Sequence, residues 1–253
     1  MGAVTAAVSR LAALAPDRVV TAALSATYPR FEPELARLAD FCPPRGTALD
    51  IGAWYGPWSR ALARRVPRVV AVEPNPAVAA VLSRTAPGNV DVVRAAITDA
   101  AGPGVLYVPE TGRGTEAVAS MATRVGSAVP VTTTTIDRIA PPDVSFIKLD
   151  VEGMEATALR GATDVLSTRA PVLLIELEYR RSPVDEVVDL LADHGYTAEI
   201  LEDGHWRPLT GFDLATHQER ALPEVDGRGY LSKVLFGGPR YINNVLFRKP
   251  SAG

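Results

Sequence analysis

Short apolar runs alternate with amphipathic segments along most of the chain, and the runs have the length of single buried strands. They predict seven strands, at residues 47–51, 68–73, 90–94, 144–149, 172–177, 196–201 and 242–248. The segments between them predict helices at 57–66, 76–85, 153–163 and 184–194. Strands and helices that alternate in this way form parallel sheets with right-handed crossovers. We therefore expect an α/β fold, a Rossmann-like, seven-stranded, mostly parallel sheet with helices on both faces.

The chain before the first strand reads as helical. Its apolar spacing, which includes Leu38 and Phe41, predicts a helix packed on the edge of the sheet. The alanine-rich first 15 residues follow no basic region, so they predict a further helix and not a signal peptide. We expect an N-terminal helical extension, residues 1–45, followed by one domain, residues 46–253.

Two regions break the alternation of strands and helices. Residues 98–143 contain two candidate strands, VLYVPE and VPVTTTTI, around a glycine-rich loop. Residues 202–240 are mixed polar and aromatic and precede the last strand. Because long segments in such positions often cover a ligand, we expect residues 202–240 to cap the functional site.

Charge and cysteine content narrow the function classes. The chain of 253 residues has a net charge of −3 and no basic cluster, which disfavours a nucleic-acid partner. Its single cysteine, Cys42, excludes an internal disulfide and a CxxC metal site. No apolar run is long enough to span a bilayer. We expect a cytoplasmic protein without a nucleic-acid or membrane partner, and we leave homodimer formation open.

The stretch TALDIGAWYGPWS carries the strongest functional signal. A strand ends in Asp50, a turn holds Gly52 and Gly56, and a helix follows directly, as at the nucleoside-binding edge of a doubly wound sheet. The next strand ends in Glu73, about 20 residues on, where such folds place the acid that binds ribose hydroxyls. The GxGxxG pattern of dinucleotide sites is absent, and an acid before the first glycine suits a cofactor with an amino acid and no pyrophosphate. The pattern points to S-adenosylmethionine, although the glycines alone also fit an ordinary tight turn.

Acidic residues end four of the predicted strands, at Asp50, Glu73, Asp150 and Glu176. Ligands of open α/β sheets bind outside the carboxyl ends of the strands, so these acids outline a crevice, although each one alone also fits a helix-dipole partner. Lys148 lies two residues before Asp150, so both side chains leave the same face of the strand. Because a buried lysine needs an anionic partner, the two form either a structural ion pair or a pair that orients or deprotonates a hydroxyl.

His217 is the histidine with a candidate role in chemistry, as a general base, since it lies in the segment expected to cap the site. His194 precedes a glycine at a predicted helix end, and His205 lies in a predicted hairpin turn, so both favour structural roles. The chain has no HExxH, GxSxG or P-loop pattern.

Three segments together resemble the FkbM family of S-adenosylmethionine-dependent methyltransferases. They are DIGAWYG with VVAVEPNP, then IKLDVEGMEATALRGA, then the apolar strand ending in Glu176. The resemblance covers roughly residues 31–180 and the last strand, and IKLDVEG with the following glutamate is its most specific part. It implies a class I methyltransferase fold whose seventh strand runs antiparallel. It also implies O-methylation of a hydroxyl, often on a sugar or a natural-product scaffold.

The resemblance further implies which residues contact S-adenosylmethionine. The methionine part would lie against the glycine turn, at Asp50, Gly52, Ala53, Tyr55 and Gly56. The ribose would meet Glu73 and Asn75, and the adenine would meet Ala96 and Ile97. Asp150 and Glu152 would face the transferring methyl group. Family members often carry asparagine where this chain has Trp54 and Tyr55, two aromatic residues that can stack on the acceptor or narrow its pocket.

Residues and resemblance together predict an S-adenosylmethionine-dependent O-methyltransferase that acts on a small hydroxylated molecule. The candidates for removing the acceptor proton are, in order, Asp150, Lys148, Glu176 and His217. Asp150 and Glu176 are alternatively ligands for Mg²⁺, which prefers carboxylate oxygens. An NAD(P)-dependent oxidoreductase and a non-catalytic nucleotide-binding module are the alternative functions.

Overall fold

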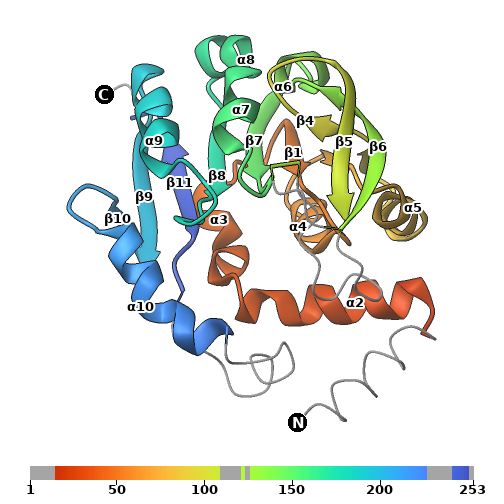
Figure 1. The fold of residues 1–253 in the computed structure, drawn as a ribbon, viewed down its shortest axis with the longest axis horizontal. Coiled ribbons are helices and arrows are strands. Elements are labelled where there is room, and N and C mark those ends of the chain that lie inside the picture. Colours follow the sequence, from red (N-terminus) through yellow and green to blue (C-terminus); the bar gives the residue numbers. More distant parts are fainter. Residues whose placement is uncertain (1–14, 109–120, 123–125, 227–240, 251–253) are drawn as a thin grey trace.

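The computed structural model describes residues 15–108, 121–122, 126–226 and 241–250. Within these ranges a main sheet of eight strands carries helices on both faces (Figure 1). Its strands are β1 (Thr47–Ile51), β2 (Arg68–Val72), β3 (Val90–Val93), β7 (Val144–Leu149), β8 (Val172–Glu176), β9 (Thr197–Glu202), β10 (His205–Pro208) and β11 (Asn244–Arg248). Across the sheet their order is β10-β9-β11-β8-β7-β1-β2-β3.

All seven predicted strands are present in this sheet. The strands from β3 to β8 in this order pair in parallel, and β11 runs antiparallel between β8 and β9. The Rossmann-like, mostly parallel sheet and the antiparallel last strand are therefore confirmed. The predicted number of strands is one too few, because β10 folds back on β9 as a hairpin. Its turn holds Asp203 and Gly204 at positive φ, which an Asp-Gly pair readily adopts.

The two candidate strands of residues 98–143 form a separate sheet. In the part of the chain that the structure describes, β5 (Gly102–Val108) and β6 (Ser127–Thr134) pair antiparallel, and β4 (Ala96–Ile97) pairs with β6 in parallel. The loop between β5 and β6 lies mostly outside the described residues.

The helices cover the main sheet from both sides. They are α2 (Asp17–Thr27), α3 (Leu38–Phe41), α4 (Pro57–Leu62), α5 (Pro76–Thr85), α6 (Ile136–Ile139), α7 (Glu155–Arg160), α8 (Thr163–Thr168), α9 (Val184–Asp193) and α10 (Leu214–Asp226), with the 3-10 helices η1 (Tyr28–Arg30) and η2 (Pro33–Arg37). On one face α7, α8 and α9 pack over Ile147 and Ile175. On the other face η2, α3 and α4 pack over Phe146 and Leu174.

The single helix predicted at 153–163 is wrong in two respects. It begins later than predicted, and two short helices, α7 and α8, stand in its place. Glu152 and Gly153 have φ values of 51° and 92°, which lie outside the helical region, so α7 begins only at Glu155. It ends directly before Gly161, as predicted, and α8 follows as a separate helix. A Cβ at Gly161 would lie 2.4 Å from the carbonyl oxygen of Thr98, so close packing fixes the glycine there.

The segment before β1 packs on a face of the sheet, so the predicted position at its edge is wrong. Leu35, Leu38 and Phe41 share one apolar cluster with Phe146 of β7 and Leu246 of β11. The sequence pattern identified the buried side chains correctly, but it does not tell a central face from an edge. Residues 1–14, which were predicted as a helix, lie outside the described residues.

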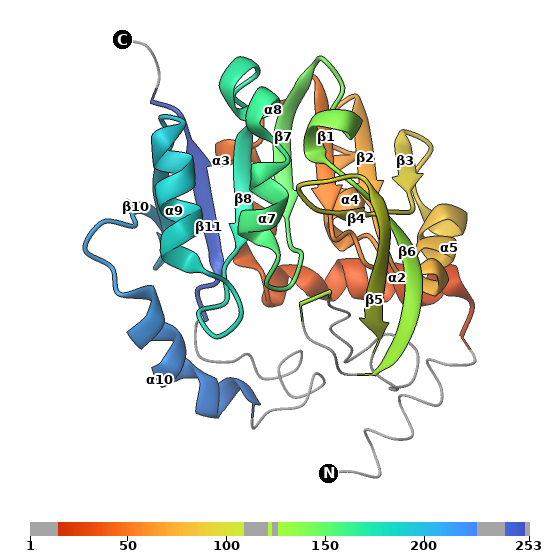
Figure 2. The same cartoon turned by 45° about the horizontal axis from the view of Figure 1, so that its top comes forward.

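Helix α2 runs across the edge at which the parallel strands end, as both views of the ribbon show (Figures 1 and 2). Its Leu24 packs against Tyr55, in the turn after β1, and against Val78 of α5. The N-terminal segment therefore covers the ligand-binding edge of the sheet as well as one of its faces.

The region expected to cap the site contains β10 and α10, while residues 227–240 lie outside the description. Gln218 of α10 is buried, and its Nε2 donates to the carbonyl oxygens of Leu177 and Ile242. This side chain holds α10 against the end of β8 and the start of β11. None of the helices in the described ranges is long and apolar enough to cross a membrane.

Candidate active site

A row of polar side chains crosses the main sheet near the carboxyl ends of its parallel strands. The apolar cluster under η2 and α4 includes Ala48, Phe146, Leu174 and Leu246, which come from four strands. Two positions nearer the edge, the same strands carry Asp50, Lys148, Glu176 and Asn244. Residues two apart in a strand share a face, and the register pairs the first two and the last two of these residues. The sheet thus brings two of the predicted catalytic residues beside the predicted cofactor acid.

The turn after β1 has backbone geometry that excludes side chains at its first glycine. Gly52 has a φ of 81°, and a Cβ there would lie 1.8 Å from the carbonyl oxygen of Asp150. Gly56, with a φ of 80°, directly precedes α4. Trp54 between them also has a positive φ, 49°, a strained conformation for a residue with a side chain. The cofactor turn therefore passes directly beside the residue expected to face the methyl group.

Glu73 is held by the backbone of two loops. Its Oε2 accepts from the backbone N–H of Trp54, and its Oε1 accepts from that of Asn75, both at 2.8 Å. Asn75 in turn caps α5, since its Oδ1 accepts from the N–H of Ala77. Burial raises the pKa of Glu73 to about 7, although the two hydrogen bonds lower it. Each carboxylate oxygen keeps a lone pair for a further donor, such as a ribose hydroxyl.

Asp50 is buried below the turn, with an exposed fraction of 1%. Its Oδ2 accepts a close hydrogen bond from the hydroxyl of Ser59 in α4. Burial raises the pKa of Asp50 to about 6, while the bond from Ser59 and the charge of Lys148 lower it. The carboxyl group fixes the start of α4 relative to β1, and with a pKa of about 6 it is mostly ionised at neutral pH although it is buried.

Lys148 is buried, and its ammonium group has few charged or polar neighbours in direct contact. Its Nζ lies 4.0 Å from Oε2 of Glu176 and 5.6 Å from the ring centre of Trp58, and it has no hydrogen-bond partner among the described residues. Burial alone would lower its pKa, but the charges of Asp150, Glu32 and Glu176 raise it overall, so the ammonium keeps its proton. A buried ammonium with unused donors can bind an oxygen of a ligand or of water.

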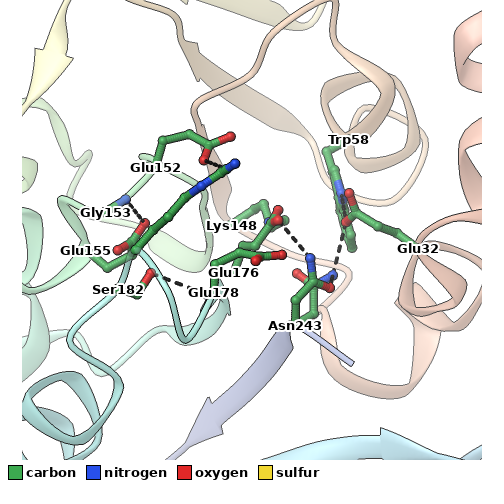
Figure 3. A network of polar contacts seen from close by, with 12 residues as sticks. Glu32, Trp58, Lys148, Glu152, Gly153, Glu155, Glu176, Glu178, Ser182 and Asn243 are labelled. Carbon is green, nitrogen blue, oxygen red and sulfur yellow. Dashed lines mark hydrogen bonds and ion pairs between the residues drawn. The ribbon is translucent and has the colours of Figure 1, made fainter. Parts of the chain in front are cut away.

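Glu176 connects the site to the last strand. Its Oε1 accepts from Nδ2 of Asn243 at 2.7 Å. Burial and the charge of Asp150 raise the pKa of Glu176 well above its usual range, against the opposing charge of Lys148. Figure 3 shows Glu176 and Lys148 between the loop of Glu152 on one side and Glu32 on the other.

Sequence reasoning missed Glu32, which lies between η1 and η2. It is 7% exposed, and its Oε2 accepts from Nε1 of Trp58 at 2.7 Å and from Nδ2 of Asn244 at 3.2 Å. A single acid in a helical segment gives no signal for such a role. The pair Asn243 and Asn244 does give one, because two amides open an otherwise apolar strand.

The loop after β7 is fixed by polar contacts at its base and its tip. Oε2 of Glu152 accepts from Arg181 at 2.7 Å, and Oε1 of Glu155 accepts from the N–H of Gly153 at 2.9 Å. Arg181 belongs to the loop after β8, so the ion pair joins the two loops that flank Asp150.

The remaining predicted cofactor residues are largely buried in the fold. Ala96 and Ile97 form β4, and Ala53 is 2% exposed. Tyr55 packs against Leu24 of α2, so its side chain joins the turn after β1 to that helix.

His217 lies in α10, and its Nε2 accepts from the backbone N–H of Ile242 at 3.2 Å. The Nε2 lone pair is therefore already used, which weakens the hypothesis of a general base at this residue. In the described ranges, no group of three or more His, Cys, Asp or Glu side chains could hold a metal ion. The expected Mg²⁺ site at Asp150 and Glu176 thus finds no support, and the Lys148 ammonium lies against Glu176 instead.

The strand order, with the glycine turn after β1, defines an α/β protein with the Rossmann-like fold of class I methyltransferases. The profile of the Methyltransferase FkbM domain matches residues 50–198, which is more than half of the chain. The chain belongs to the FkbM methyltransferase family. This match favours a methyltransferase over a nicotinamide-dependent oxidoreductase. No curated protein sequence matches the chain.

Solved structures with a similar fold include a methyltransferase FkbM from Methylobacillus flagellatus, with 18% identity and a TM-score of 0.45 over 62% of this chain. This chain spans only 40% of that protein. A precorrin-6y C5,15-methyltransferase from Geobacter metallireducens has 16% identity and a TM-score of 0.45, covering 87% of this chain and 86% of that one. A precorrin 8w decarboxylase from Methanobacterium thermoautotrophicum has 14% identity and the same TM-score, covering 86% and 88%. Similarity of this degree says nothing about the substrate of this chain.

Proposed function

We propose that the protein transfers the methyl group of S-adenosylmethionine to a hydroxyl oxygen of a small molecule, such as a sugar or a natural-product scaffold. The observation that carries the proposal is the contact between the Gly52 turn and the backbone of Asp150. Because of this contact, the proposed cofactor turn lies directly beside the loop that carries Asp150, the proposed acceptor-side carboxylate.

The residues present fit S-adenosylmethionine. Gly52 lets the turn after β1 pack directly against the backbone of Asp150, which places the two expected halves of the site side by side. Glu73 presents a carboxylate fixed by two N–H groups, as the ribose hydroxyls of the cofactor require. Asp50, Gly52 and Gly56 would hold the methionine part, and the cofactor, when bound, supplies an electrophilic methyl group on a charged sulfonium.

Asp150 is our candidate for accepting the proton of the acceptor hydroxyl. It is partly exposed, whereas Lys148 is 1% exposed and its ammonium already carries its proton. The acceptor oxygen gains positive charge as the new bond forms, and a carboxylate beside it stabilises that charge and removes the proton. Lys148 would orient Glu176 and the acceptor oxygen through its unused N–H groups.

Methyl transfer from labelled S-adenosylmethionine to a panel of hexoses, deoxysugars and cyclic alcohols tests this function. We expect Asp150→Asn to lower kcat by about 100-fold or more, the range for loss of a general base, with S-adenosylhomocysteine binding retained. Asp143→Asn is the matched control, since this exposed carboxyl lies at the opposite end of the same strand and should leave turnover unchanged. Full turnover in Asp150→Asn would contradict the role of Asp150, and a label on nitrogen or carbon would contradict O-methylation.

A further inference from the structure

Tyr28 lies against the cofactor turn, although neither the sequence pattern nor the family match includes it. It begins η1, directly after α2. Its ring centre is 6.2 Å from that of Trp54 in the turn after β1 and 6.4 Å from that of Phe31. The backbone N–H of Trp54 is one of the two donors to Glu73. Tyr28 therefore contacts the loop that would hold the cofactor.

Three carboxyl groups act electrostatically on Tyr28. Burial, and then the charges of Glu32, Asp150 and Glu176, raise the pKa of Tyr28 well above its usual value. The phenol therefore keeps its proton at neutral pH. Its O–H is hydrogen-bonded to the side chain of Glu32, so the lone pairs of its oxygen are what it offers to a ligand. A neutral phenol hydrogen-bonded to the Glu32 side chain presents negative potential at its oxygen, which favours a positively charged group.

Glu32 holds Tyr28 through a hydrogen bond between the two side chains and through a backbone contact. Its backbone N–H donates to the carbonyl oxygen of Tyr28 at 3.0 Å, and its carboxylate is held by Trp58 and Asn244. Tyr28 and Glu32 both precede the matched range 50–198, so the N-terminal segment adds to the site from outside the family domain.

We propose that Tyr28 is a specificity-determining residue whose phenol oxygen contacts the positively charged centre of the methyl donor and distinguishes it from the uncharged product. The inference rests on the proposed function. A cation beside a phenol is attracted by the oxygen lone pairs and by the ring face, and an uncharged thioether gains neither contribution. The contact would hold the charged cofactor and would favour release of the product.

Calorimetric titration of the full chain with sinefungin and with S-adenosylhomocysteine tests the inference without an acceptor. Sinefungin carries an ammonium group where the methyl donor carries its sulfonium, and S-adenosylhomocysteine is uncharged there. Tyr28→Phe keeps the ring on Trp54 and Phe31 and removes only the oxygen. We expect it to weaken sinefungin binding about tenfold, as for one hydrogen bond to a charged group, and to change S-adenosylhomocysteine binding by no more than about twofold.

Two further variants accompany Tyr28→Phe. Glu32→Gln keeps an oxygen for Trp58 and Asn244 but removes the charge, so it should also weaken sinefungin selectively. Tyr196→Phe is the matched control, because that hydroxyl is buried and has no hydrogen-bond partner in the described part of the chain. It should leave both affinities unchanged.

Each outcome decides one way. Selective loss of sinefungin in Tyr28→Phe supports the inference. Equal weakening of both ligands would give Tyr28 a purely structural role and overturn it, and so would unchanged binding of both. A wild-type protein that binds neither ligand would contradict the proposed function itself, and this inference with it.

Discussion

At the scale of single residues, the candidate site is built from carboxyl groups that are buried in the fold. Burial raises the pKa of Asp50 to about 6 and that of Glu73 to about 7. Lys148 is the cation buried among them, and its N–H groups have no partner within the described ranges. Such perturbed groups gather at functional sites more often than elsewhere, because ligand binding compensates for the cost of enclosing them.

Asp50→Asn should raise stability and lower cofactor affinity. The folded pKa of about 6 lies above the ordinary value of 3.8, so the folded state binds the proton more tightly than the unfolded state does. The free energy of unfolding should therefore fall as pH rises from about 4 to about 6, and asparagine removes this loss. At pH 7 we expect the variant to be more stable by about 2 kcal/mol, measured by urea denaturation.

Asp143→Asn is the control for this substitution, because its exposed carboxyl also accepts from a hydroxyl, that of Thr47. It should show no such gain. If the Asp50→Asn protein is less stable than the wild type at pH 7, the conclusion that burial of the Asp50 charge destabilises the fold is wrong.

At the scale of elements, the turn after β1 and the loop after β7 form one unit. The carbonyl oxygen of Asp150 occupies the space beside Gly52, and the N–H of Asp150 donates to Ile51 at 3.0 Å. Trp54 and Glu152, one in each loop, both have positive φ without being glycine. Residues held in such conformations gather where a ligand is clamped, which agrees with a cofactor site between the two loops.

Gly52→Ala should break this unit. The added Cβ would overlap the Asp150 carbonyl, and neither backbone segment can move without the other. We expect loss of S-adenosylhomocysteine binding in calorimetry and a stability loss of roughly 3 kcal/mol or more in urea denaturation, as for severe overpacking.

Gly195→Ala provides the matched comparison. Gly195 has the same φ of 81°, but a Cβ there would meet nothing within 4 Å. The Gly195→Ala variant should be less stable by only about 1 kcal/mol, the cost of a left-handed backbone conformation at alanine, and it should keep its ligand binding. If Gly52→Ala bound S-adenosylhomocysteine as well as Gly195→Ala does, the close approach at Gly52 would have no functional meaning.

The elements themselves could be predicted where local pattern and tertiary environment agree. Apolar runs predicted the strands best at the centre of the sheet, because β1, β2 and β7 are buried along almost their whole length. The start of α7 could not be predicted, because the φ values of Glu152 and Gly153 follow from the loop contacts with Arg181. The strand β10 was missed because an exposed edge strand of four residues has little apolar pattern to detect.

At the scale of the whole molecule, the site combines a contiguous half and a dispersed half. The proposed cofactor half, from Asp50 to Glu73, lies within one βαβ unit, so sequence spacing alone is enough to propose it. The acceptor half needs Glu32 from the N-terminal segment and Asn244 from the last strand. No local pattern joins residues so far apart, and only the folded sheet brings them to Lys148.

The central claim is that the crevice binds S-adenosylmethionine, and calorimetric titration with S-adenosylhomocysteine and, separately, with NADH tests it most directly. The account predicts micromolar binding of S-adenosylhomocysteine and no binding of NADH, because the turn is shaped for an amino-acid cofactor and lacks the GxGxxG pattern. Binding of NADH alone would contradict the account.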